Sequence, residues 1–260
     1  MSILVAYKYA ANPQDASVNA DGSLDWSRAK KSVSEYDPVA AQVGRDLADA
    51  LGTELVGISV GTADIASGSA KKNAMSKGFD RGVILADDAL AQWGAVSTAG
   101  ALAEVVKREE NPRLILTGDA SVDEGARLFS ALLAAHLGIP CFQNVSSIEL
   151  IDAGNDTWQV VQNLPGGASR TLSIQGQAVL ALTSDAATPK APSMKEILAA
   201  AKKPVEVLTC TDIPSVQPAE PVSSTPVPAQ TISRKNITLE GSPEEIASQL
   251  VEALRADGVL

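Results

Sequence analysis

The residues best suited to chemistry in this 260-residue sequence lie in the segment Gly118-Asp119-Ala120-Ser121-Val122-Asp123-Glu124-Gly125-Ala126-Arg127. The segment follows an apolar run typical of a strand and comes before a helical pattern. Backbone N–H groups at such a junction have no partner within the helix, and they can bind the phosphate of a nucleotide. The segment has neither a P-loop nor a GxGxxG pattern. Two interpretations therefore stand: a nucleotide site, or an ordinary helix start with Asp123 as the N-cap.

Two further groups of residues could cover the same site. Lys8 comes directly after the first apolar run, and Ser34-Glu35-Tyr36-Asp37 comes just before the first helical pattern. A lysine and a tyrosine at such places are more often plain surface residues. Their position in the sequence makes them candidates for ligand contact without excluding that simpler role.

The rest of the chain offers little for catalysis. His136, the only histidine, lies at an apolar helix end where the macrodipole favours it, so we expect a structural role. Asp80-Arg81 is expected to be a local ion pair that fixes a turn. No set of residues combines a nucleophile, a base and oxyanion donors, so we expect no enzyme active site within the chain.

Composition and charge exclude several classes of protein. The formal net charge is −10 and the pI is about 4.6, which disfavours nucleic acid as a partner. No apolar run approaches the roughly 18 residues of a membrane helix, so we expect no direct membrane insertion. The only cysteines are Cys141 and Cys210, too few for a structural zinc site, and we expect no metal. The first residues lack a signal-peptide pattern, which predicts a cytoplasmic protein.

Alternating strand and helix patterns define the first 140 residues. Because parallel strands need crossover connections, this alternation predicts an α/β fold: a doubly wound, mostly parallel sheet, a Rossmann-like nucleotide-binding domain. Ligands of such sheets bind at the carboxyl ends of the strands, here just after Ala6, Val60 and Thr117. The predicted strands are 3–7, 55–60, 82–85 and 114–117, and the predicted helices are 38–51, 67–77, 95–108 and 123–137.

The second half of the sequence predicts a β-hairpin, a further strand and an extended arm. The hairpin pairs 157–163 with 170–174, and a core strand covers 177–183. A polar loop from 184 leads into a helix over 193–202. Six prolines between 204 and 228 then favour an extended arm.

The sequence ends in an amphipathic helix. Ser242, Pro243 and Glu245 form a capping box with proline at the first helical position. The apolar stripe of this helix could dock on a partner or back on its own domain. We therefore predict a nucleotide-binding α/β domain over 1–203 and an arm with its terminal helix over 204–260.

Taken together, these segments resemble the β subunit of the electron transfer flavoproteins over nearly the whole chain. The most specific match is Lys77-Gly78-Phe79-Asp80-Arg81-Gly82-Val83, which is similar to the family's Asp-Arg-Gly block before a strand. Lys8, Val33 to Asp37 and Gly118 to Phe129 resemble the family's first lysine, its nucleotide-covering loop and its phosphate loop. The glycine hairpin, the last core strand, the loop 184–203 and the closing arm also match.

The resemblance implies an electron carrier without catalysis of its own. Such a β subunit pairs with an α subunit that holds the redox FAD, and the heterodimer accepts electrons from a flavin-dependent dehydrogenase. The β subunit itself holds AMP, or a second FAD in bifurcating members. Loop 184–203 is expected to recognise the partner, with Met194 where the family places a leucine that inserts into the dehydrogenase. The expected cofactor-binding residues are Ala6, Lys8, Ser34, Glu35, Tyr36, Asp37, Val60, Gly118, Ala120, Ser121, Val122, Asp123, Gly125, Ala126 and Arg127.

The phosphate loop departs from the family pattern of Gly-Lys-Gln-Ala-Ile-Asp. Asp119 replaces the lysine, and Phe129 stands at a normally small position, so both changes disfavour a phosphate. Arg127 could supply the missing positive charge, or it could be an outward-facing arginine. One alternative is therefore a structural, partner-binding subunit that has lost its nucleotide. A nucleotide-hydrolysing or adenylating enzyme is a third alternative, which needs a catalytic constellation that the sequence lacks.

Overall fold

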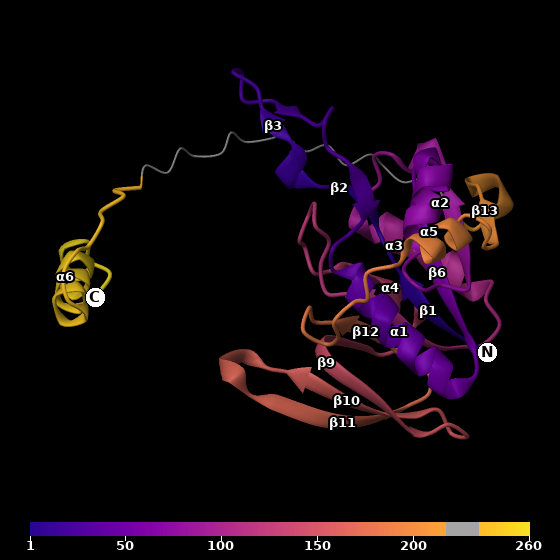
Figure 1. Ribbon diagram of the computed structural model, residues 1–260. Helices are drawn as coiled ribbons and strands as arrows, with labels where there is room; N and C mark the ends of the chain where they lie inside the picture. The colour runs from indigo at the N-terminus through magenta and orange to yellow at the C-terminus, as the bar shows by residue number, and fades with distance from the viewer. Residues whose placement is uncertain (217–233) are drawn as a thin grey trace. The chain divides into compact units, whose positions relative to one another are not determined.

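The computed structural model describes residues 1–216 and 234–260, and it divides the chain into the compact units Met1–Thr225 and Pro226–Leu260. All strands of the described residues lie in the first unit (Figure 1). In chain order these are β1 (Ser2–Ala6), β2 (Tyr9–Ala11), β3 (Ser17–Val18), β4 (Leu24–Asp25), β5 (Lys31–Val33), β6 (Glu54–Gly61), β7 (Arg81–Ala86), β8 (Pro112–Gly118), β9 (Cys141–Asp152), β10 (Thr157–Asn163), β11 (Ser169–Gln175), β12 (Val179–Leu182) and β13 (Val205–Leu208).

A mixed, mostly parallel sheet of nine strands organises this unit, in the order β11-β10-β9-β12-β8-β1-β6-β7-β13. The pairs on either side of β1 are parallel, as are the pairs of β12 with β8 and β9. Within this sheet the antiparallel pairs are β9 with β10 and β10 with β11, a band at one end (Figure 1), and the short pairs β2–β5 and β3–β4 form two separate antiparallel sheets. The predicted α/β fold and its hairpin are therefore confirmed.

Helices cover both faces of the sheet because residues of each central strand alternate between two apolar clusters. Ile3 and Val5 of β1 lie in one cluster, and Leu4 and Ala6 lie in the other. The first cluster includes residues of α1, α2 and α5, and the second includes residues of α3 and α4. The helices of the described residues are α1 (Asp37–Leu51), α2 (Gly68–Met75), α3 (Ala95–Lys107), α4 (Phe129–Leu137), α5 (Met194–Ala200) and α6 (Pro243–Ala256).

Most predicted elements have the predicted type, but the helix expected over 123–137 is wrong at its start. Helix α4 begins at Phe129, so Asp123 is not its N-cap. Gly125 has φ of 61° and Arg127 has φ of 55°, and such left-handed residues cannot continue a right-handed helix. The segment Asp119–Leu128 is therefore a loop, and it stands between strand β8 and the helix.

The sequence analysis also missed the short strands β2, β3, β4 and β5, and two strands of the main sheet. β9 was not predicted, although it pairs with both β10 and β12. β13 lies within the segment from Pro204 that was expected to be extended, and it pairs in parallel with β7 as the edge of the main sheet. The prolines of the predicted arm between 217 and 233 lie outside the described residues.

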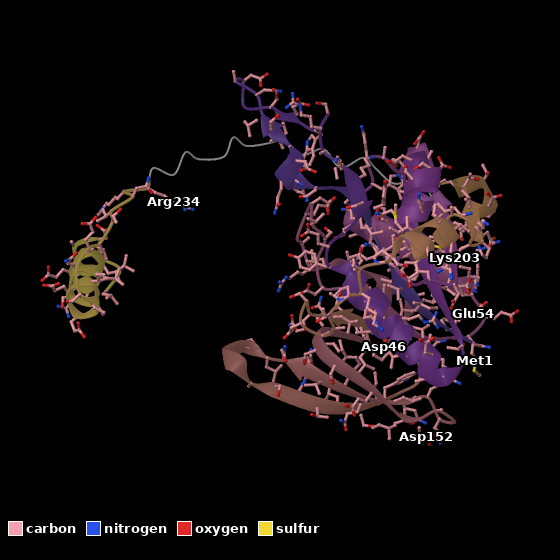
Figure 2. All side chains as sticks on the ribbon, viewed as in Figure 1. Met1, Asp46, Glu54, Asp152, Lys203 and Arg234 are labelled. Carbon is pink, nitrogen blue, oxygen red and sulfur yellow. The ribbon has the colours of Figure 1, made fainter. Side chains whose placement is uncertain are left out.

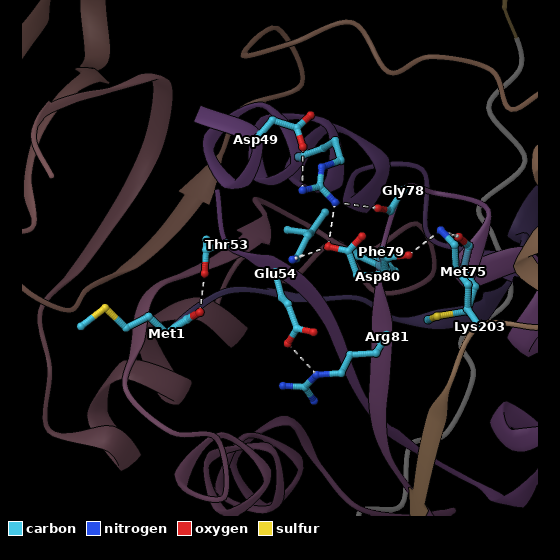
Figure 3. A network of polar contacts seen from close by, with 12 residues as sticks. Met1, Asp49, Thr53, Glu54, Met75, Gly78, Phe79, Asp80, Arg81 and Lys203 are labelled. Carbon is cyan, nitrogen blue, oxygen red and sulfur yellow. Dashed lines mark hydrogen bonds and ion pairs between the residues drawn. The ribbon is translucent and has the colours of Figure 1, made fainter. Parts of the chain in front are cut away.

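The expected ion pair between Asp80 and Arg81 is also wrong. Asp80 instead accepts hydrogen bonds from the Arg45 side chain and the Leu55 backbone N–H, each at 2.8 Å. Arg81 pairs with Glu54 and makes two bonds to Glu109 (Figure 3 shows the Glu54 pair). Asp80 lies in the bend before β7 and Arg81 begins the strand, and each charge has its own partners.

The second unit contains α6, whose predicted capping box is confirmed. The Ser242 hydroxyl accepts the Glu245 N–H at 3.3 Å, and Glu245 accepts the Ser242 N–H at 2.8 Å. None of the residues of α6 is buried in the described chain. No helix in the described ranges is both long and apolar enough to span a bilayer.

Candidate functional site

A cavity of about 360 Å³ lies at the carboxyl ends of the three central strands. Ala6 ends β1, Val60 lies near the end of β6, and Gly118 ends β8, and all three line it. These strands are neighbours in the order β8-β1-β6. The cavity therefore lies where an open parallel sheet binds its ligands, and its volume falls within the range of roughly 300–1,000 Å³ found for ligand pockets.

Asp37 joins the ends of β1 and β8 on one side of the cavity. Its carboxylate accepts the Lys8 N–H at 2.7 Å and is also hydrogen-bonded by the Gly118 N–H. Burial raises the pKa of Asp37 to about 7, against the opposing effect of these N–H groups and of the Lys8 charge. A side chain at Gly118 would put a Cβ atom 2.8 Å from both Asp37 Oδ1 and Tyr36 Cβ. Glycine is therefore required for this close approach of strand end and helix start.

Ser34 holds the loop that follows β8. Its backbone N–H donates to the Lys8 carbonyl at 2.8 Å, and its hydroxyl accepts the Val122 N–H at 3.1 Å. Ser34 is completely buried. The side chain thus fixes the loop against the segment before α1, and it acts on the cavity through the backbone without lining it.

Among the described residues, both cations that line the cavity form ion pairs with acidic residues of the loop after β8. Lys8 Nζ lies 2.7 Å from Asp123 Oδ2 and 3.3 Å from Glu124 Oε1. Arg127 Nη2 lies 3.4 Å from Asp119 Oδ2. Although burial opposes it, the Lys8 ammonium holds the pKa of Asp123 below its usual value. Three acidic residues of the loop are therefore paired with Lys8 or Arg127 before any ligand binds.

An apolar wall and two unpaired polar atoms complete the cavity. Leu90, Trp93 and Phe129 line it, and the sequence analysis placed none of the three among the cofactor-binding residues. Thr117 Oγ1 and Asp119 Oδ1 also belong to lining residues, and both are buried without a hydrogen-bond partner among the described residues. A buried hydroxyl without a partner is costly, so Thr117 Oγ1 is available to a ligand.

Ten of the expected cofactor-binding residues line this one cavity. The other five, namely Ser34, Glu35, Tyr36, Val122 and Gly125, do not line it. Their contact with a ligand stays a prediction, as does that of the lining residues. The lining residues among those predicted are Ala6, Lys8, Asp37, Val60, Gly118, Ala120, Ser121, Asp123, Ala126 and Arg127.

His136 lies away from this cavity. Its Nε2 is 3.1 Å from the Val96 carbonyl oxygen, which connects the end of α4 to the first turn of α3. No group of three or more histidine, cysteine or acidic side chains in the described part of the chain is arranged to hold a metal ion. The described residues thus form a ligand cavity at the carboxyl ends of the central strands, with an apolar wall and paired charges.

Comparison with known protein families shows which family the chain resembles. The model of the electron transfer flavoprotein domain matches residues 22–213, which is more than half of the 260-residue chain. The chain therefore belongs to the electron transfer flavoprotein family. Proteins of this family are electron carriers that work with flavin cofactors, and the match does not distinguish the α from the β subunit.

Proposed function

We propose that this member of the electron transfer flavoprotein family is the β subunit of a heterodimer that carries electrons from a flavin-dependent dehydrogenase to a downstream acceptor. The observation that supports this most directly is the cavity at the ends of β1, β6 and β8, formed largely by the segments that resemble the β subunit. An FAD on the α subunit would supply the redox chemistry. The residues of this chain would bind and orient, and they transfer no group themselves.

In this proposal the cavity holds the adenosine part of AMP or of a second FAD. The half-buried Trp93 and Phe129 give a planar base an apolar surface, and apolar surface removed from water stabilises binding. Thr117 Oγ1 is a buried hydroxyl without a partner among the described residues, and it can bond a polar group of the ligand. Hydrogen bonds to Asp37 and Ser34 fix the strand ends and the loop that form the wall of the cavity.

A second candidate is a structural subunit without a nucleotide. Asp119 and Phe129 favour it, because an added carboxylate and a bulky ring both disfavour a phosphate group. Both candidates share the heterodimer, and they differ only in what the cavity contains.

Co-purification with the α subunit tests both candidates. The complex is denatured, and released FAD and AMP are quantified against protein by chromatography. One FAD and one AMP per heterodimer support the carrier with AMP, and two FAD support a second flavin in this chain. One FAD with no AMP supports the structural subunit. A chain that retains no FAD-binding partner contradicts the proposed function.

Met194 is the proposed contact with the dehydrogenase. It begins helix α5, the residue is 76% exposed, and Ser193 caps the helix so that Met194 lies in the first turn. Met194→Ala should slow reduction by the dehydrogenase about tenfold or more, because buried interface anchors typically contribute about 2 kcal/mol or more. Ile151→Ala, at an exposed apolar residue of β9 outside the loop 184–203, is the matched control. Loss of FAD from the Met194→Ala complex would contradict a role limited to docking.

A further inference from the structure

The charges of the cavity are the feature that the proposed function leaves unexplained. Among the described residues that line it, Lys8 and Arg127 are the cations, and Asp37, Asp119, Asp123 and Glu124 are the acids. Each cation already contacts a carboxylate of the loop after β8. The cavity thus contains more acids than bases, and both positive groups have partners before any ligand enters.

A phosphate group that enters this cavity must compete for these cations. A phosphate monoester carries a charge of about −1.5 to −2 at neutral pH, and it binds best to cations that are free. If Arg127 turned to a phosphate, Asp119 would lose its counter-ion, although its side chain is only 9% exposed. A buried carboxylate without a counter-ion is strongly disfavoured.

We propose that Asp119 is a specificity-determining residue. Its carboxylate pairs with Arg127, and the cavity therefore binds adenosine in preference to AMP. This inference rests on the proposed adenine site. Lys8 is occupied in the same way by Asp123 and Glu124. The apolar wall and the unpaired Thr117 hydroxyl are uncharged, so they favour adenosine and AMP equally. The charged groups of the loop therefore decide between the two ligands.

A competing arrangement has the opposite consequence. Arg127 is 62% exposed and contacts Asp119 through one nitrogen, so its other N–H groups could reach a phosphate while Asp119 holds the side chain in place. In that arrangement Asp119 would assist phosphate binding. Removing its charge separates the two cases, because AMP affinity rises in the first and falls in the second.

The test is equilibrium dialysis with the full chain, unfolded, freed of nucleotide and refolded. The unaltered chain should bind adenosine at least about threefold more tightly than AMP. Asp119→Asn should raise AMP affinity about tenfold, as expected for removing one charge at close range from a dianion. Its affinity for adenosine should stay within about twofold. Glu124→Gln, at an exposed side chain paired with Lys8, should raise AMP affinity by a smaller factor.

Glu149→Gln is the matched control, because it removes the same charge from an exposed position of β9 that does not line the cavity. It should leave the affinities for both ligands unchanged. The inference is overturned if the unaltered chain binds AMP as tightly as adenosine or more tightly, if Asp119→Asn does not gain AMP affinity, or if neither ligand binds. Because the assay needs no partner subunit, such a result leaves the test of the proposed function, FAD in the heterodimer, separate.

Discussion

The ionisation of the buried Asp37 carboxyl group makes the stability of the fold depend on pH. Its pKa is about 7 in the folded chain and near 4 when unfolded, so the folded state binds the extra proton between these values. The contribution of the Asp37 carboxyl group to the free energy of unfolding is therefore greatest below about pH 4, and it is lost as the pH rises through about 7. Asp37→Asn cannot lose a proton, so it should remove this pH dependence. The free energy of unfolding of the variant, relative to that of the unaltered chain, should therefore rise between about pH 5 and 8. Urea unfolding at both pH values measures it, and a constant difference would contradict the assignment.

Gly118 is the residue at which the packing beside the cavity leaves no room for a side chain. Gly118→Ala places a methyl group 2.8 Å from Asp37 Oδ1, so we expect a loss of about 1–3 kcal/mol in the free energy of unfolding. Gly68→Ala is the matched control, because no atom lies within 4 Å of its added Cβ at the start of α2. It should leave stability unchanged or raise it slightly. Equal changes in the free energy of unfolding of the two variants would contradict this expectation, because they would show that neighbouring atoms move and relieve the close contact at Gly118.

The predicted site residues that line the cavity follow from one topological rule. Ala6, Val60 and Gly118 were found because ligands of a parallel sheet bind where strands end. Trp93 was missed because it reaches the cavity from the loop after β7, and nothing in its local sequence marks that approach. Arg127 was predicted, but its pairing with Asp119 depends on a left-handed backbone residue that sequence patterns do not reveal.

At the scale of elements, Lys203 connects α5 to the end of α2. Lys203 is labelled in Figure 2, and its ammonium donates to the Phe79 carbonyl at 2.5 Å and to the Met75 carbonyl at 3.2 Å (Figure 3). Met75 is the last residue of α2, where the helix dipole favours a cation. Lys203→Met keeps the apolar stem and removes the charge, so we expect a loss of about 1 kcal/mol, discounted for partial exposure.

Urea unfolding measures that loss, and hydrogen exchange over residues 194–200 locates it. Lys202→Met is the matched control at an exposed neighbouring position, and it should change neither quantity. Faster exchange in both variants would indicate a general effect of lost charge and would contradict a specific tether.

The type of an element could be predicted where the spacing of apolar residues determines it. The predictions failed where contacts with distant parts of the chain determine the structure. The four central strands and helices α1, α2 and α3 follow their apolar periods closely. The start of α4 does not, because the segment before it is held as a loop by Ser34 and Lys8 from the other end of the chain. Strand β9 mixes polar and apolar residues, and only its pairing with β10 and β12 identifies it.

At the scale of the whole molecule, the boundary at Thr225 permits a direct test of the C-terminal helix. Deleting residues 226–260 should leave the unfolding of the first unit unchanged, since α6 buries no residue. In the proposed heterodimer, we expect the truncated chain to lose the α subunit in co-purification, because the exposed apolar residues Leu250 and Val251 would no longer be present to dock on it.

A point substitution sharpens this test. Leu250→Ala should weaken retention of the α subunit, and Glu252→Ala on the same helix should not. A truncated chain that retains the α subunit would contradict a docking role for α6.

The place of β12 in the sheet has a consequence for how the chain is assembled during synthesis. β12 pairs with β8 on one side and with β9 on the other, so it alone connects the antiparallel band to the parallel strands. Its residues, Val179–Leu182, come after both neighbours in the chain. Until the ribosome has released them, β8 and β9 expose unpaired edges, which are prone to pair with other chains. Nascent chains that stop before Val179 should therefore need a chaperone more than nascent chains that include Leu182.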